Sequence, residues 1–164
     1  MDRSLTAWAA ALLVGALPSL GLAAEWGGIT PGESAAETVR ARYGNPSRES
    51  RQTLESYPTI QWVYEGARAP VGMKRMVVDF GLLAPQGYRP TVVRSMMLEP
   101  KPGVFRRGIV IDGWGTPDRI GTEQEQEVFY YASGLVVYFA KGGADAVTML
   151  FTIPQTEPPK PAGR

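Results

Sequence analysis

An internal repeat restricts the possible folds of this chain more than any other feature of its sequence. Residues 31–48 (PGESAAETVRARYGNPSR) align without a gap on residues 102–119 (PGVFRRGIVIDGWGTPDR), and an aromatic residue, Tyr43, faces another, Trp114. A repeat of this kind indicates that one structural unit occurs twice. The identical residues are Pro31, Gly32, Val39, Gly44, Pro46 and Arg48, which face Pro102, Gly103, Val110, Gly115, Pro117 and Arg119.

The first 24 residues have the pattern of a secretory signal peptide. A short head containing Arg3 precedes an apolar run over residues 5–22, and the small residues Ala23 and Ala24 follow it. This order predicts export with cleavage near Ala23 or Ala24. The alternative is a retained membrane anchor, since the run approaches the roughly 20 residues that span a bilayer. Pro18 and the small residues at the end of the run favour cleavage.

The first copy of the repeat predicts a helix over residues 34–43. Ser34 and Glu37 have the spacing of a capping box at its start. Gly44 suits a left-handed cap at its end, and Pro46 prevents its continuation. Because Gly44 and its counterpart Gly115 both follow a helix and precede x-Pro, both are predicted to have positive φ. The face predicted to point inward carries Ala36, Val39 and Tyr43, with Val110 and Trp114 as their counterparts in the second copy.

Apolar and polar residues then alternate in the manner of strands. Alternation with Gly- and Pro-containing connections predicts antiparallel strands with one face on a core. The expected strands are 59–65, 73–80 and 91–98 in the first copy and 127–132, 135–140 and 146–153 in the second, with 48–56 as a further edge strand. A common offset aligns the last strands through Val93 with Val147, Met97 with Phe151, and Pro100 with Pro154. The predicted fold class is α+β, with two tandem α-β-β-β units that share a core.

The resulting domain plan has four segments. Residues 1–24 form the signal peptide, 25–100 the first unit, 101–154 the second, and 155–164 a disordered tail with three prolines. The chain has no cysteine, so the exported protein has no disulfides and no lipid-modified N-terminal cysteine. We therefore expect a protein without a stable membrane anchor after cleavage. Its oligomeric state is not indicated.

Charge and composition argue against several functional classes. The 17 basic and 16 acidic residues nearly cancel, which gives no sign of a nucleic-acid partner. Histidine and cysteine are absent, which removes the commonest catalytic bases and metal ligands, and we expect no cofactor or metal site. A hydrolase that uses Glu123, Glu125 and Asp112 is an open alternative. The simpler interpretation of those carboxylates is a solvated strand entry.

Several short motifs resemble the SmpA/OmlA domain of outer-membrane assembly lipoproteins, the BamE-like proteins. Two such units in one chain are also similar to the tandem arrangement of the β-lactamase inhibitor protein. The resemblance implies a periplasmic or secreted, non-enzymatic domain that binds another protein. The lipidated cysteine of the lipoproteins and the disulfides of the inhibitor are missing. The matching residues are Gly28-Ile29-Thr30-Pro31-Gly32, Ser34, Glu37, Val39, Tyr43-Gly44-Asn45-Pro46 and Trp62-x-Tyr64.

Aromatic residues are concentrated on the predicted strands, and they indicate a candidate binding face. Consecutive aromatics at 129–131 place rings on both faces of one strand, so they cannot all enter one core. We expect at least one of Tyr130 and Tyr131, with Val63 or Val77, on an exposed face that binds a partner. The alternative is that one set of aromatics is core and the other lies under a loop or the neighbouring unit.

The sequence thus predicts an exported, non-enzymatic protein-binding or scaffolding module of the bacterial cell envelope, with another envelope protein as its partner. The alternative is an inhibitor of an envelope or extracellular enzyme. A protruding loop at residues 84–89 would favour the inhibitor.

Overall fold

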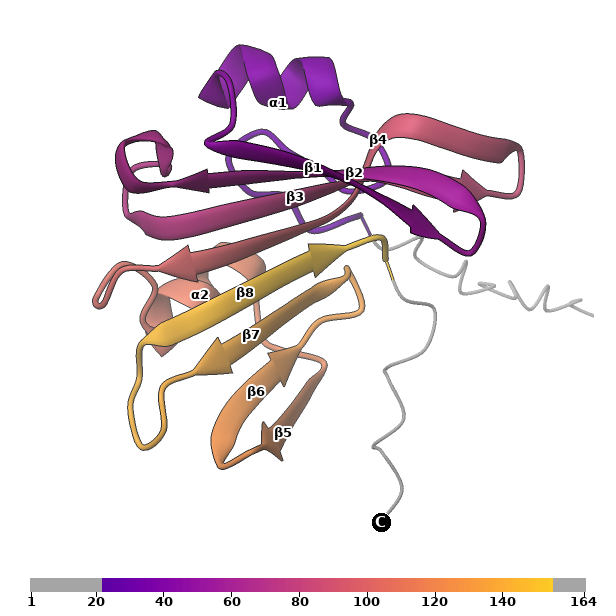
Figure 1. The fold of residues 1–164 in the computed structure, drawn as a ribbon. Coiled ribbons are helices and arrows are strands. Elements are labelled where there is room, and N and C mark those ends of the chain that lie inside the picture. The colour runs from indigo at the N-terminus through magenta and orange to yellow at the C-terminus, as the bar shows by residue number, and fades with distance from the viewer. Residues whose placement is uncertain (1–21, 155–164) are drawn as a thin grey trace, which may run out of the picture.

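The computed structural model describes residues 22–154 of the chain. The predicted tail and all but the last three residues of the predicted signal peptide lie outside this range. Eight strands form one antiparallel sheet in the order β1-β2-β3-β4-β8-β7-β6-β5 (Figure 1). The elements are α1 (Ala36–Tyr43), β1 (Arg48–Leu54), β2 (Tyr57–Glu65), η1 (Gly66–Arg68), β3 (Met73–Ala84), β4 (Gly87–Pro100), α2 (Arg107–Trp114), β5 (Arg119–Glu123), β6 (Gln126–Tyr130), β7 (Leu135–Phe139) and β8 (Ala146–Thr152).

The predicted fold class was wrong. The chain forms one continuous sheet with two helices of eight residues each, and not two α-β-β-β units. Four strands follow each helix, whereas only three were predicted in the second half. The missing one is β5, since residues 119–123 were not assigned to a strand and Glu123 was interpreted as part of a solvated strand entry. Strands β1 and β5 are the two edges of the sheet. Edge strands often carry charged side chains, so they lack the alternation of apolar and polar residues by which strands are recognised.

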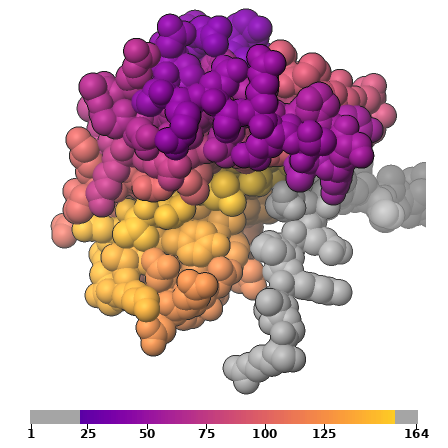
Figure 2. Space-filling view, in the orientation of Figure 1, coloured from indigo at the N-terminus to yellow at the C-terminus, as the bar shows by residue number. Residues whose placement is uncertain are grey.

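The two halves meet where β4 pairs with β8, with Ser95 opposite Thr152 and Leu98 opposite Met149. In the space-filling view, residues of the first half and of the second half form one continuous surface (Figure 2). Among residues 22–154, no helix is long and apolar enough to cross a membrane.

Two isolated β-bridges show which positions of the two halves are equivalent. Ala35 bridges to Val92, and Arg106 bridges to Asp145. Strand β8 therefore aligns on β4 one residue earlier than the sequence offset indicated. The predicted pairing of Val93 with Val147 was wrong, since Val93 is buried whereas Val147 is 36% exposed. A register error of one residue exchanges the two faces of a strand.

Both predicted helix ends can be compared with the structure. The capping box is wrong, because α1 begins at Ala36 and the Ser34 hydroxyl accepts the Thr30 amide at 2.9 Å instead. The glycines that follow the helices have positive φ as predicted, 75° at Gly44 and 84° at Gly115. Their ψ angles of −160° and −174° are extended, so neither glycine is in the left-handed helical region.

Both helices pack on the same face of the sheet, around one core. Val39 of α1 and Val110 of α2 are fully buried in it, as predicted. The N-terminal segment links the two helices: Trp26 stacks on Tyr43, and the Trp114 indole donates to the Glu25 carbonyl at 3.2 Å. The largest fully buried strand residues are Tyr64, Met73, Met76, Phe80, Met96, Leu98, Phe129, Leu135, Phe139, Met149 and Phe151.

Candidate binding surface on the sheet

The face of the sheet opposite α1 and α2, the helix-free face, carries one row of side chains that crosses all eight strands. Six of the eight members are apolar apart from one tyrosine hydroxyl, and the two ends are arginines at equivalent repeat positions. We call this set the apolar row. In order across the sheet it consists of Arg48, Val63, Val77, Met97, Leu150, Val136, Tyr130 and Arg119.

The alternation of each strand places this row on the helix-free face. Trp62 and Val78, the neighbours of Val63 and Val77 along the strands, belong to the core beneath the helices. Successive side chains of a strand point to opposite faces. In Figure 1, α2 lies behind β7 and β8, so the view looks onto the helix-free face of the second half.

Polar side chains flank the apolar row in the first half. On one side the Asp79 carboxylate accepts hydrogen bonds from Gln61 and Ser95, each at 2.9 Å. On the other side Arg75 lies 3.6 Å from Glu65 and 3.4 Å from Glu99. Each set joins residues of adjacent strands, which stabilises a sheet. The apolar row of the first half therefore lies between two sets of polar side chains, each linked across adjacent strands by hydrogen bonds or ion pairs.

In the second half, an aromatic and carboxylate cluster flanks the row. The Glu123 carboxylate accepts from the Tyr130 hydroxyl and, at 3.1 Å, from the Tyr138 hydroxyl. The Arg119 guanidinium lies 3.9 Å from the centre of the Tyr130 ring. Burial, together with the Glu123 charge, raises the pKa of Tyr130 to about 12. The hydroxyl therefore remains a hydrogen-bond donor at neutral pH.

The four predicted site residues are placed differently from the expectation. Val63, Val77 and Tyr130 lie in the apolar row, but Tyr131 points into the core, where it donates to the Gly115 carbonyl at 3.1 Å. The predicted exposure is wrong, since the side chains are 1%, 5%, 7% and 6% exposed in the order Val63, Val77, Tyr130 and Tyr131. The Arg119 guanidinium lies over the Tyr130 ring and covers it.

The accessible apolar part of the row is its middle, which the sequence analysis did not identify. Met97, Leu150 and Val136 are half-buried, on the adjacent strands β4, β8 and β7. Met97 and Leu150 face each other across the seam between the halves. Along its strand each of them lies between fully buried residues, so the alternation already indicated that they face away from the core. The correct register across the seam was needed to see that they are adjacent.

The structure does not bring the three candidate catalytic carboxylates together. Glu123 is bonded to two tyrosines on the helix-free face, and Glu125 pairs with Lys141 at 2.7 Å in an adjacent turn. Asp112 lies on α2, on the other side of the sheet. Within residues 22–154, no group of three or more acidic residues is placed to hold a metal ion.

Comparisons with known proteins leave the family of this chain open. No family model matches it, and no curated protein matches it. One solved structure that is similar is a DUF4309 family protein (YjgB) from Bacillus subtilis, with 11% sequence identity over 77% of this chain and 83% of that chain. Its TM-score is 0.43, which is too low to carry an argument about function. The resemblance to the SmpA/OmlA domain stays a prediction.

Proposed function

We propose that this chain is a non-enzymatic, exported protein-binding module of the cell envelope, and that it binds its partner with the helix-free face of the sheet. The observation that carries the proposal is the apolar row, which crosses the sheet on the face that neither helix covers. Apolar and aromatic residues with a polar surround are the usual composition of a protein contact surface.

The geometry of this face suits a protein partner. Eight strands at a spacing of about 4.8 Å give a width of roughly 30 Å, enough for an interface of about 800 Å² per partner. The half-buried middle at Met97, Leu150 and Val136 would form the centre, and the arginines at the two ends would lie at the rim. The hydrogen-bonded sheet is also rigid, so the backbone of this face loses little conformational entropy when it binds a partner.

The alternative function, inhibition of an enzyme, is favoured by a different feature. Strands β3 and β4 have 12 and 14 residues, and their hairpin extends to one side of the sheet (Figure 1). Leu83 near its tip is 53% exposed, and Leu54 of the neighbouring hairpin is 50% exposed. A projecting hairpin with exposed leucines could enter the cleft of an enzyme.

Charge substitutions separate the two candidates. We expect Leu150→Lys to reduce retention of a partner from an envelope fraction by about tenfold or more, since a charge in the centre of an interface is costly. A lysine at this half-buried site can extend its amine into water, so the melting temperature should change little. Retention by immobilised protein, followed by mass spectrometry, measures the effect.

Val147→Lys on the same strand is the matched control, because Val147 is outside the apolar row. It should retain the partner. Equal retention by Leu150→Lys and the unmodified protein would contradict binding by the helix-free face. Loss with Leu83→Lys alone would favour the inhibitor.

A further inference from the structure

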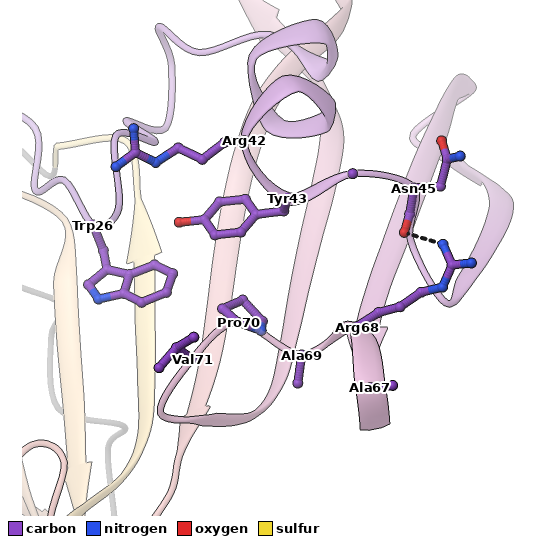
Figure 3. A pocket seen from close by; sticks show the side chains of 10 residues that line it. Trp26, Arg42, Tyr43, Asn45, Ala67, Arg68, Ala69, Pro70 and Val71 are labelled. Carbon is purple, nitrogen blue, oxygen red and sulfur yellow. Dashed lines mark hydrogen bonds between the residues drawn. The ribbon is translucent and has the colours of Figure 1, made fainter.

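A groove of about 630 Å³ lies beside the C-terminal end of α1, and it is separate from the helix-free face (Figure 3). Its walls come from α1, from the N-terminal segment and from the connection between β2 and β3. We call it the arginine groove. The residues that matter for its chemistry are Trp26, Arg42, Tyr43, Arg68, Pro70 and Val71.

The two arginines stand at opposite ends of the groove, with the Tyr43 ring and Pro70 between them (Figure 3). Arg68 is held by a hydrogen bond of 2.8 Å from its Nη1 atom to the Asn45 carbonyl. Arg42 lies against Gly28 and next to the Tyr43 hydroxyl, which donates to the Gly27 carbonyl at 3.1 Å. Both side chains thus have a defined position.

The positive charge of the groove is not neutralised by the part of the chain that the structure describes. No carboxylate lines the groove, and neither Arg42 nor Arg68 forms an ion pair within residues 22–154. Glu25, which is next to Trp26, accepts the Gly28 amide at 3.0 Å instead. Several other arginines do pair with acids, namely Arg48, Arg51, Arg75, Arg106 and Arg107.

The middle of the groove is apolar. The Trp26 and Tyr43 rings are parallel within 3°, with centroids 6.0 Å apart. Val71 is 99% exposed at its margin, and Pro70 lies beside it. Aromatic and apolar walls with a few fixed polar groups are characteristic of ligand sites.

The fold itself does not require these features. The connection between β2 and β3 spans residues 66–72, whereas the equivalent one between β6 and β7 spans only 131–134. The repeat position of Arg42 is Gly113 in the second half. The second half therefore has the same helix and strands without an arginine at this helix position and without the longer loop that carries Arg68.

We propose that the arginine groove binds an acidic peptide segment in which an apolar residue lies between two carboxylates. Arg42 and Arg68 each pair with one carboxylate, and the apolar side chain packs on Tyr43 and Pro70. Charge complementarity supports this occupant, since guanidinium groups form their strongest hydrogen bonds with carboxylates. The inference is independent of the proposed function, because the groove lies on other elements than the apolar row.

The test uses the full chain and the peptide acetyl-Glu-Leu-Glu-amide, with acetyl-Gln-Leu-Gln-amide as the neutral control. Binding is followed at low salt by the NMR signal of the Trp26 indole N–H, which a Trp26→Phe variant identifies. We expect the acidic peptide to shift this signal saturably. Arg42→Gln and Arg68→Gln should each weaken binding by about tenfold, since one charge-assisted contact of 1.4 kcal/mol corresponds to this factor.

Arg89→Gln is the matched control, because Arg89 is exposed and donates from Nη1 to a backbone carbonyl, that of Gly32, as Arg68 does to Asn45. It should bind the acidic peptide unchanged. The double variant R42E/R68E should instead bind acetyl-Lys-Leu-Lys-amide. Equal binding of neutral and acidic peptides, an equal loss in Arg89→Gln, or no saturable shift would overturn the proposal. Leu150→Lys should leave peptide binding intact, so this test and that of the helix-free face can fail separately.

Discussion

In the first half of the sheet, β3 and β4 have 12 and 14 residues, and in the second half their counterparts β7 and β8 have five and seven. The turn after each helix shows no such difference. Tyr64 donates to the Gly44 carbonyl at 3.0 Å, and Tyr131 donates to the Gly115 carbonyl at 3.1 Å. The halves thus agree where a helix is joined to the sheet, and they differ at the ends of the strands.

This difference separates what the fold needs from what was added to it. Each candidate feature of the first half depends on a segment that is shorter in the second half. The projecting hairpin depends on β3 and β4, and the arginine groove depends on the connection between β2 and β3. The apolar row, by contrast, takes four residues from each half and depends on both. The row therefore draws its residues from both halves, whereas the residues that line the groove all come from the first half.

The largest expected effect concerns the two equivalent tyrosines. Tyr64→Ala and Tyr131→Ala should each lower the free energy of unfolding by about 3–5 kcal/mol, as is typical of truncating a large buried aromatic side chain. Both tyrosines belong to one core. We therefore expect a single cooperative unfolding transition in urea for either variant, with far-UV circular dichroism and tryptophan fluorescence changing together.

Tyr64→Phe and Tyr131→Phe keep the ring and remove only the hydrogen bond, so each should cost about 1 kcal/mol. Two separate transitions in either alanine variant would show that the halves unfold independently. A small effect at one site only would break their equivalence.

A smaller effect is expected at the turn glycines. An added Cβ would meet no atom within 4 Å at Gly44 or at Gly115, so the cost of a side chain there comes from the backbone alone. With positive φ and extended ψ, both positions are nearly restricted to glycine. Gly44→Val and Gly115→Val should each cost about 1–2 kcal/mol in thermal unfolding.

Gly103→Val, at another glycine with positive φ and open surroundings, is the control for a loop outside the helix ends. It should show a comparable backbone cost but leave the helix intact. Unchanged melting temperatures for Gly44→Val and Gly115→Val would contradict the turn geometry in both halves.

The parts of the fold that could be predicted from the sequence are those with a local cause. Gly44 and Pro46 end a helix by themselves, and the inward face at Val39 follows from helical spacing. The apolar alternation also located six strands. Edge strand β5 was missed because its exposed residues have no buried face to alternate with. The helix start failed because Ser34 found a different partner, the Thr30 amide.

The candidate surface was harder to predict because it depends on distant register. Val63, Val77 and Tyr130 were assigned to one face, and the structure places them in one row. The burial of Tyr130 could not be predicted, since it depends on Arg119 of the neighbouring strand, which lies over the ring. The pairing of β4 with β8, which brings Met97 opposite Leu150, joins segments about 50 residues apart and is not contained in either pattern alone.

The smallest expected effect concerns the arginines at the ends of the apolar row. Arg48 and Arg119 occupy the same repeat position, but Arg48 lies 3.5 Å from Glu65 with both side chains about half exposed, whereas Arg119 stacks on the Tyr130 ring. An exposed ion pair contributes little and is screened by salt, so Arg48→Gln should cost about 0.3 kcal/mol at low salt and less at high salt.

Arg119→Gln should cost about 0.5–1 kcal/mol, with a weaker dependence on salt, because a cation over an aromatic ring is partly shielded from water. The buried Arg119 Nε atom has no hydrogen-bond partner among residues 22–154, which keeps the cost in this lower range. Urea unfolding at two salt concentrations measures both variants, with Arg51→Gln on exposed β1 as the control. Equal costs and equal salt dependence for Arg48→Gln and Arg119→Gln would show that the two halves use this repeated arginine in the same way after all.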